Sequence, residues 1–239
     1  MVRMRQILKF IGTGGAFSTK YVNNSAYYYL KNDELLLFDS GETVFHEILK
    51  LNIITENIKR VDIIITHFHS DHVGSLGSLV FYLRFKKVRE VNIIFPIKRL
   101  PYMLLDIYGI DEKLYNVKTP KEIEEYYIKE YEQLHGDVGN NGEIIPMPSY
   151  GYHVISDNDN FFYSGDTCVI SDIILEKFKD KKIKIMYHEV ATDGYKSHMQ
   201  LDYLAKLIQF EDRKRVVCMH MGDNVDVLKI KKLGFESVR

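Results

Sequence analysis

The sequence contains one dense group of metal-binding side chains, and this group directly follows an apolar run. Residues 61–65 are mostly β-branched, which predicts a buried strand. His67, His69, Asp71 and His72 come next, and imidazole and carboxylate groups are the donors that Zn²⁺ and similar ions take. His67 and His69 can point the same way and share one ion, while Asp71 and His72 are placed to hold a second. The alternative is a polar loop with chance histidines, which four donors in this spacing disfavour.

Composition and charge exclude several classes of protein. The chain has 239 residues, of which 46% are hydrophobic, so it is long enough to bury a sizeable core. We expect one domain over residues 1–239, because no repeat, low-complexity tract or linker is visible. The net charge of −1 gives no general attraction to nucleic acid. Two cysteines make no disulfide framework, and no apolar stretch reaches the length of a membrane span. We therefore expect a cytoplasmic protein without membrane contact.

The motif at residues 67–72 resembles the metallo-β-lactamase superfamily, in which His-x-His-x-Asp-His follows a hydrophobic strand. The glycine-rich residues 12–19 resemble the first glycine motif of the ribonuclease Z branch. Within that branch, the chain most resembles the small cyclic-nucleotide phosphodiesterases of phages and bacilli known as anti-Pycsar proteins. The resemblance implies an α/β (α+β) fold, namely a four-layer αββα sandwich with the ions in a cleft along one edge of the sheets.

The resemblance implies further metal ligands at the ends of later strands. Asp166 follows an expected strand at residues 161–163 and corresponds to the bridging aspartate, while His220 follows residues 216–219 and corresponds to a ligand of the second ion. His135 is our candidate for the third ligand of the first ion. The intervening loop is longer than in the tRNA enzymes, so His153 is the alternative. His153 lies inside an extended run, where a histidine more often packs against a sheet.

A glutamate and a histidine near the carboxyl-terminal end complete the expected site. Glu189 ends an expected strand, and His198 lies between Ser197 and Gln200, a pair that fits a capping box and predicts that a helix begins there. In the ribonuclease Z branch a histidine of this kind, oriented by the glutamate, is thought to protonate the leaving oxygen. We expect Asp71, His198 and Glu189 to be the catalytic residues.

The resemblance also implies a function. We expect two divalent ions, Zn²⁺ or alternatively Mn²⁺, and hydrolysis of 3′,5′-cyclic nucleotides (cAMP, cGMP, cCMP and cUMP) to nucleoside 5′-monophosphates by a homodimer. Such an activity would counteract cyclic-nucleotide (Pycsar) anti-phage signalling. The alternatives are a ribonuclease Z-like tRNA 3′-processing endonuclease, a non-catalytic nucleotide-binding protein, and an acyl hydrolase, which would not explain Glu189 with His198. Five tyrosines could stack on a base, at positions 102, 108, 150, 152 and 195, although such tyrosines are more often core or rim residues.

Overall fold

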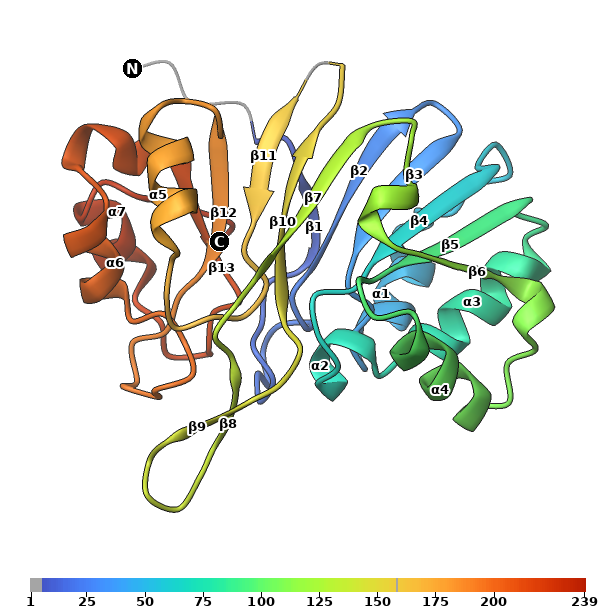
Figure 1. Cartoon of the computed structure of the whole chain (residues 1–239), viewed down its shortest axis with the longest axis horizontal. Helices are drawn as coiled ribbons and strands as arrows, with labels where there is room; N and C mark the ends of the chain where they lie inside the picture. Colours follow the sequence, from blue (N-terminus) through green and yellow to red (C-terminus); the bar gives the residue numbers. More distant parts are fainter. Residues whose placement is uncertain (1–5, 158) are drawn as a thin grey trace.

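Two six-stranded sheets pack face to face at the centre of the molecule, with helices on both outer sides (Figure 1). The structure is a computed structural model that describes residues 6–157 and 159–239. Its layers confirm the predicted αββα sandwich. Within these residues, no helix is long and apolar enough to cross a membrane.

The first sheet is built in chain order from the amino-terminal half. Its strands are β1 (Lys9–Gly12), β2 (Ser25–Lys31), β3 (Glu34–Phe38), β4 (Arg60–Ile64), β5 (Glu90–Ile94) and β6 (Asn116–Lys118). Strands β3 to β6 run parallel to one another. The helices of this half are α1 (Val44–Leu51), α2 (Ser70–Val73), α3 (Leu76–Phe85) and α4 (Arg99–Ile107).

The second sheet comes from the carboxyl-terminal half. In spatial order its strands are β14 (Glu236–Ser237), β13 (Val216–Met219), β12 (Ile185–Glu189), β11 (Asn160–Tyr163), β10 (Tyr150–Ile155) and β7 (Tyr127–Glu132). Helices α5 (Asp172–Lys179), α6 (Leu201–Leu207) and α7 (Val227–Lys232) cover its outer side (Figure 1). A separate hairpin of β8 (Gly136–Val138) and β9 (Ile144–Pro146) projects from the body of the molecule.

Aromatic side chains join the inner faces of the two sheets. The rings of Phe38 on β3 and Tyr163 on β11 stack with their centroids 4.4 Å apart, and Phe161 packs against Phe38 at 6.0 Å. All three side chains are completely buried, so the two sheets share one apolar interface. Strands β11, β12 and β13 are parallel, as are β3, β4 and β5, and parallel strands present their carboxyl ends at one edge of a sheet.

Candidate metal centre

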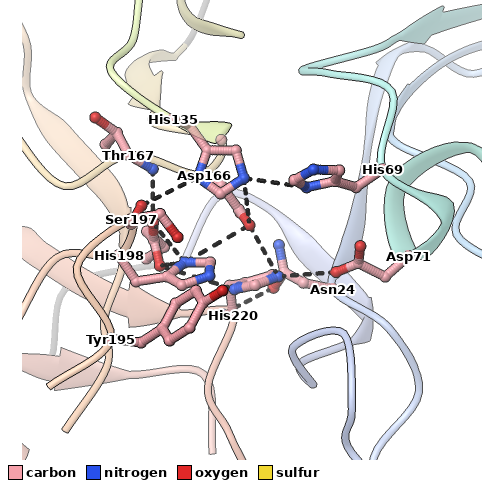
Figure 2. A network of polar contacts seen from close by, with 12 residues as sticks. Asn24, His69, Asp71, His135, Asp166, Thr167, Tyr195, Ser197, His198 and His220 are labelled. Atoms are coloured by element: carbon pink, nitrogen blue, oxygen red, sulfur yellow. Dashed lines mark hydrogen bonds and ion pairs between the residues drawn. The ribbon is translucent and has the colours of Figure 1, made fainter. Parts of the chain in front are cut away.

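The carboxyl ends of strands from both sheets bring the predicted donors together (Figure 2). Among the residues that the structure describes, three groups have ligand atoms within 4.8 Å of one another: His67, His69 and His135; Asp71, His72, Asp166 and His220; and His135, Asp166, Glu189 and His198. We call these the first, second and third donor clusters. Each contains residues that are distant in sequence, so the clusters exist only in the folded chain.

The first donor cluster consists of three imidazoles whose nitrogens converge. His67 Nε2 and His135 Nε2 each lie 3.1 Å from His69 Nδ1. Tetrahedral zinc holds imidazole nitrogens at about 2.0–2.1 Å, which places neighbouring ligand nitrogens about 3.3 Å apart. The spacing of the three nitrogens therefore fits one shared cation.

The remaining ring nitrogens of this cluster have acceptors that fix the tautomer. His67 Nδ1 lies 3.1 Å from the Thr66 hydroxyl, and His135 Nδ1 donates to the carbonyl oxygen of Ser197 at 3.0 Å. Burial lowers the pKa of His67 well below its usual range and that of His135 to about 4. Both rings are thus neutral near pH 7, with Nε2 available as a ligand.

The second donor cluster joins the two sheets directly. His72 Nε2 lies 3.3 Å from Asp71 Oδ2 and 3.4 Å from Asp166 Oδ2. His220 Nε2 approaches the same two oxygens at 3.2 and 3.3 Å. Asp166 Oδ2 is also 3.8 Å from His135 Nε2, so this carboxylate lies between the first and second clusters.

Two buried polar atoms of the second cluster lack a hydrogen-bond partner in the described part of the chain: His72 Nε2 and Asp166 Oδ1. Such groups are costly to bury unpaired, and a cation would satisfy both. The opposite ring nitrogen of His72 is fixed, because Nδ1 donates to Asp39 at 2.8 Å. Burial by itself would raise the pKa of Asp166, yet His220 and His72 hold it well below its usual range. The residues present therefore fit divalent cations.

In the third donor cluster, a carboxylate and an imidazole satisfy each other. His198 Nδ1 lies 3.0 and 2.8 Å from the two carboxylate oxygens of Glu189, and one of these oxygens accepts a bond from the Thr167 amide at 2.6 Å. Burial opposes protonation of His198, but the carboxylates of Glu189 and Asp166 raise its pKa to about 10. Because Glu189 and His198 are paired with each other, we interpret them as a proton-donating pair rather than as metal ligands.

The predicted helix start at Ser197 is wrong. Helix α6 begins at Leu201, and His198 lies in the turn before it. The backbone at Gln200 is extended, because it pairs with Ala191. The Ala191 amide donates to the Met199 carbonyl at 2.8 Å, and the Leu201 amide donates to the Ala191 carbonyl at 3.0 Å. The Gln200 side chain folds back onto this turn and donates to the Tyr195 carbonyl at 3.0 Å. Tertiary pairing thus overrides the local capping pattern.

His153 lies apart from the three donor clusters. It is part of β10, where its Nε2 contacts Asn160 at 3.0 Å and its ring packs against Tyr127 at 5.7 Å. The structure brings His135, and not His153, to His67 and His69.

Two of the five tyrosines considered for stacking on a base are buried, which places them in the core, the more common role of such residues. Tyr150 is 8% exposed, and Tyr152 is fully buried and donates to the Ile65 carbonyl at 2.8 Å. Tyr102 and Tyr108 lie on or next to α4. Tyr195 alone of the five lines the pocket beside the donor clusters.

This pocket has a volume of about 430 Å³ and opens beside the third donor cluster. Three chain segments line it, residues 15–18, 189–193 and 222–225, together with Tyr195, His198 and His220. None of its described lining residues is lysine or arginine, whereas Asp193 and Asp223 contribute carboxylates. A volume of this size suits one small ligand.

The sequence motifs did not indicate that Asp137 lies near the first donor cluster. It lies on β8, and its carboxylate is 3.8 Å from His69 Nε2, the ring nitrogen that points away from the first donor cluster. A carboxylate on the outer nitrogen of a ligand histidine is a common way to orient it. The available signal was an acidic residue two positions after His135, before the turn-forming residues 139–142.

Comparison with known proteins identifies the family that this chain resembles. Residues 6–238 match the family model described as "Anti-Pycsar protein Apyc1". The chain is 28% identical over 233 residues to the anti-Pycsar protein Apyc1 of Paenibacillus sp. (strain J14), covering 92% of this chain and 90% of that protein. It is 27% identical over 236 residues to the Apyc1 protein of Bacillus phage 010DV004, with the same coverage.

Solved structures confirm the fold. The metallo-β-lactamase fold protein YhfI from Bacillus subtilis is similar with a TM-score of 0.72 and 14% identity, over 96% of this chain and 94% of that one. The short form of human tRNase Z is similar with a TM-score of 0.67 and 18% identity, over 90% and 93% of the two chains. The predicted metallo-β-lactamase fold is therefore confirmed.

Proposed function

The chain belongs to the anti-Pycsar protein Apyc1 family, and from this premise we propose that it hydrolyses 3′,5′-cyclic nucleotides to nucleoside 5′-monophosphates. Family membership and the donor clusters support a metal-dependent hydrolase. The observation that carries the finer proposal is the pair of His198, which is partly exposed, and Glu189, which is buried; both line a pocket of nucleotide size next to the first and second donor clusters.

Seven residues would hold two cations: His67, His69 and His135 for one, and Asp71, His72 and His220 for the other, with Asp166 shared. Bound divalent cations would lower the pKa of a water molecule and neutralise charge on a phosphoryl oxygen. Histidine and carboxylate donors suit Zn²⁺, and we propose Mn²⁺ as the alternative.

His198 would supply the proton that the reaction needs at its departing oxygen. Hydrolysis forms a bond between phosphorus and the water oxygen and breaks the bond between phosphorus and the 3′ oxygen. Glu189 holds the ring through Nδ1, which leaves Nε2 to donate a proton to the 3′ oxygen. The raised pKa of His198 keeps the ring protonated near pH 7. Asp71 would accept the proton released by the attacking water.

The pocket supports a substrate with a single phosphodiester. RNA recognition relies on many lysine and arginine contacts to successive phosphates. The described lining of this pocket has no such side chain, and its acidic residues Asp193 and Asp223 would repel a second phosphate. Tyr195, which is 51% exposed, lines the same pocket and offers a surface on which a base could stack.

The test is incubation of the purified chain, loaded with Zn²⁺ or Mn²⁺, with cAMP, cGMP, cCMP, cUMP and a precursor tRNA, followed by chromatography of the products. We expect nucleoside 5′-monophosphates and an intact tRNA. Cleavage of the tRNA with all four cyclic nucleotides left intact would favour the ribonuclease Z-like alternative. Tight nucleotide binding without turnover would favour the non-catalytic one.

We also propose that the protein is a homodimer that lowers cyclic-nucleotide levels in the cytoplasm. Exposed apolar side chains on the outer side of α3 and α4 support an interaction surface, namely Phe81, Phe85, Met103 and Ile107. Light scattering during size-exclusion chromatography measures the mass in solution.

Coexpression with a nucleotide cyclase tests the cellular effect, and an unchanged cyclic-nucleotide level would contradict it.

A further inference from the structure

Two loops that line the pocket lie side by side near the second donor cluster. We call residues 13–19 the glycine loop and residues 220–224 the His220 loop. The Met221 amide donates to the Thr13 carbonyl at 3.0 Å, and the Gly15 amide donates to the Met221 carbonyl at 3.3 Å. The Asp223 carboxylate accepts a further bond from the Thr19 amide at 2.9 Å. The two loops therefore form one unit.

Arg239 ties the two loops together from outside the pocket. Its guanidinium donates to the Thr13 hydroxyl at 3.1 Å, to the Thr13 carbonyl at 3.0 Å and to the Gly222 carbonyl at 3.1 Å. It also donates to the carbonyl of Met221. The guanidinium carbon lies 3.6 Å from the centroid of the Tyr21 ring, which fixes its plane.

The sheet delivers Arg239 to this position. Strand β14 pairs in parallel with β13, with Val217 opposite Glu236 and Cys218 opposite Ser237. The Val238 amide continues the ladder by donating to the Cys218 carbonyl at 3.2 Å. Because β14 runs parallel to β13, the next residue of the chain, Arg239, lies alongside the His220 loop, which follows β13.

His220 needs support from its surroundings, because its backbone has a φ of 50°. A residue other than glycine persists in this left-handed conformation only where neighbouring contacts hold it. The His220 amide donates to Asn24 Oδ1 at 3.1 Å. The glycine loop lies against the ring, since a Cβ on Gly15 would be 3.4 Å from His220 Cε1. Asn24 thus holds the backbone amide of His220, and the glycine loop lies against its ring.

We propose that Arg239 is a positioning residue for His220. By joining the glycine loop to the His220 loop, it holds His220 Nε2 beside Asp71 and Asp166 in the second donor cluster. The inference rests on the proposed function in one respect only, namely that His220 is a metal ligand. It predicts a selective effect on the second cluster, because the first contains no residue of either loop.

The test compares Arg239→Ala and Arg239→Lys with Arg213→Ala as the matched control. The Arg213 guanidinium also donates to backbone carbonyls, those of Ile208 at 3.1 Å and Leu233 at 3.0 Å, and packs against the Phe210 ring at 5.4 Å, but it touches neither loop. Zn²⁺ and Mn²⁺ affinities are measured by calorimetry for the two sites separately, and unfolding is followed by circular dichroism.

Arg239→Ala should weaken one of two metal sites by roughly 10–100-fold and leave the other unchanged. Arg239→Lys keeps the positive charge but can form fewer hydrogen bonds, so its metal affinity should lie between that of Arg239→Ala and that of the wild type. Arg213→Ala should lower stability without changing either site. The inference would be overturned if Arg239→Ala bound metal at both sites with wild-type affinity. It would also be overturned if Arg213→Ala lost as much metal affinity as Arg239→Ala.

The metal readout separates this inference from the proposed function. A wild-type protein that binds two ions but cleaves no cyclic nucleotide would overturn the proposed substrate, and the comparison of variants would still decide the role of Arg239. A wild-type protein that binds no ion would overturn both.

Discussion

The two sheets contribute to the metal centre in different ways. The first sheet supplies four donors within six residues, at the end of β4 and in α2. The second supplies one donor from each of several connections, namely His135 before β8, Asp166 after β11 and His220 after β13. One half of the centre is thus determined by a local strand–turn–helix, and the other half by the register of a whole sheet.

This difference also separates the kinds of support that the donors receive. His72 is held by Asp39, a side chain of its own sheet, through a bond of 2.8 Å. His135 is held by the backbone carbonyl of Ser197, from a turn 62 positions away. Support for this donor of the second half therefore comes from a backbone group that the fold brings close, whereas in the first half it comes from a side chain. Substitutions in the two halves can test this contrast.

Asp166→Ala removes the carboxylate that lies between the two halves. We expect turnover to fall by at least about 10⁴-fold, because both cations would lose a ligand. Activity is measured with the cyclic nucleotide that the wild type cleaves fastest, and metal content by mass spectrometry. Asp172→Ala, at the exposed start of α5, is the control. Retention of two ions and of turnover in Asp166→Ala would contradict the bridging position.

His198→Ala removes the proposed proton donor without removing a metal ligand. We expect kcat to fall by roughly 10²–10⁴-fold with metal content unchanged. The exposed histidine of α1, His46, provides the control as His46→Ala. A loss of metal that accompanies the loss of kcat would instead make His198 a ligand of the third donor cluster.

Asp39→Asn tests the local support in the first sheet. The amide keeps the size of the side chain but has only one acceptor oxygen, whereas Asp39 uses Oδ2 for His72 and Oδ1 for the Thr66 amide, so metal affinity should fall by about 10–100-fold. Calorimetric titration with Zn²⁺ measures this change. Asp33→Asn breaks an exposed ion pair with Lys59 and should leave metal affinity unchanged. Equal affinities in the two variants would show that His72 needs no carboxylate partner.

His153→Phe should leave metal binding intact and change only the response of stability to pH. Burial lowers the pKa of His153, so the unfolded chain takes up a proton that the folded chain does not. The wild type should therefore lose stability as the pH falls below about 6.5, by at most about 1.4 kcal/mol per pH unit from this residue. Urea unfolding of the metal-free protein measures it. An unchanged pH dependence in His153→Phe would contradict the assigned burial effect.

The parts of the site that follow from local pattern could be predicted from the sequence. The motif at residues 67–72 predicts both a strand end and a metal centre, and the family resemblance assigns Asp166 and His220, each of which follows a recognisable apolar strand. The structure places these residues together. The sandwich could be predicted because the family resemblance implies it, and the order of strands and helices agrees with it.

The parts of the site that depend on pairing between separate chain segments could not be predicted from the sequence. Ser197 and Gln200 have the spacing of a capping box, yet pairing with Ala191 keeps that backbone extended. Asp137 reaches His69 only because the β8–β9 hairpin forms, and Arg239 reaches Thr13 only because β14 pairs with β13. No local pattern encodes the contacts of Asp137 and Arg239, since their partners lie 68 and 226 positions away, and the pairing of Gln200 with Ala191 depends on how the intervening turn closes.

The acidic lining of the pocket has a consequence for how the protein meets its ligand. The described lining residues include no lysine or arginine, and the carboxylates of Asp193 and Asp223 would offset the charge of the proposed cations, so the pocket should gain little from long-range attraction of an anion. Its diffusional encounter with a small phosphodiester should therefore depend only weakly on ionic strength, because there is little attraction for dissolved ions to screen. Selection among ligands should therefore depend on short-range contacts inside the pocket.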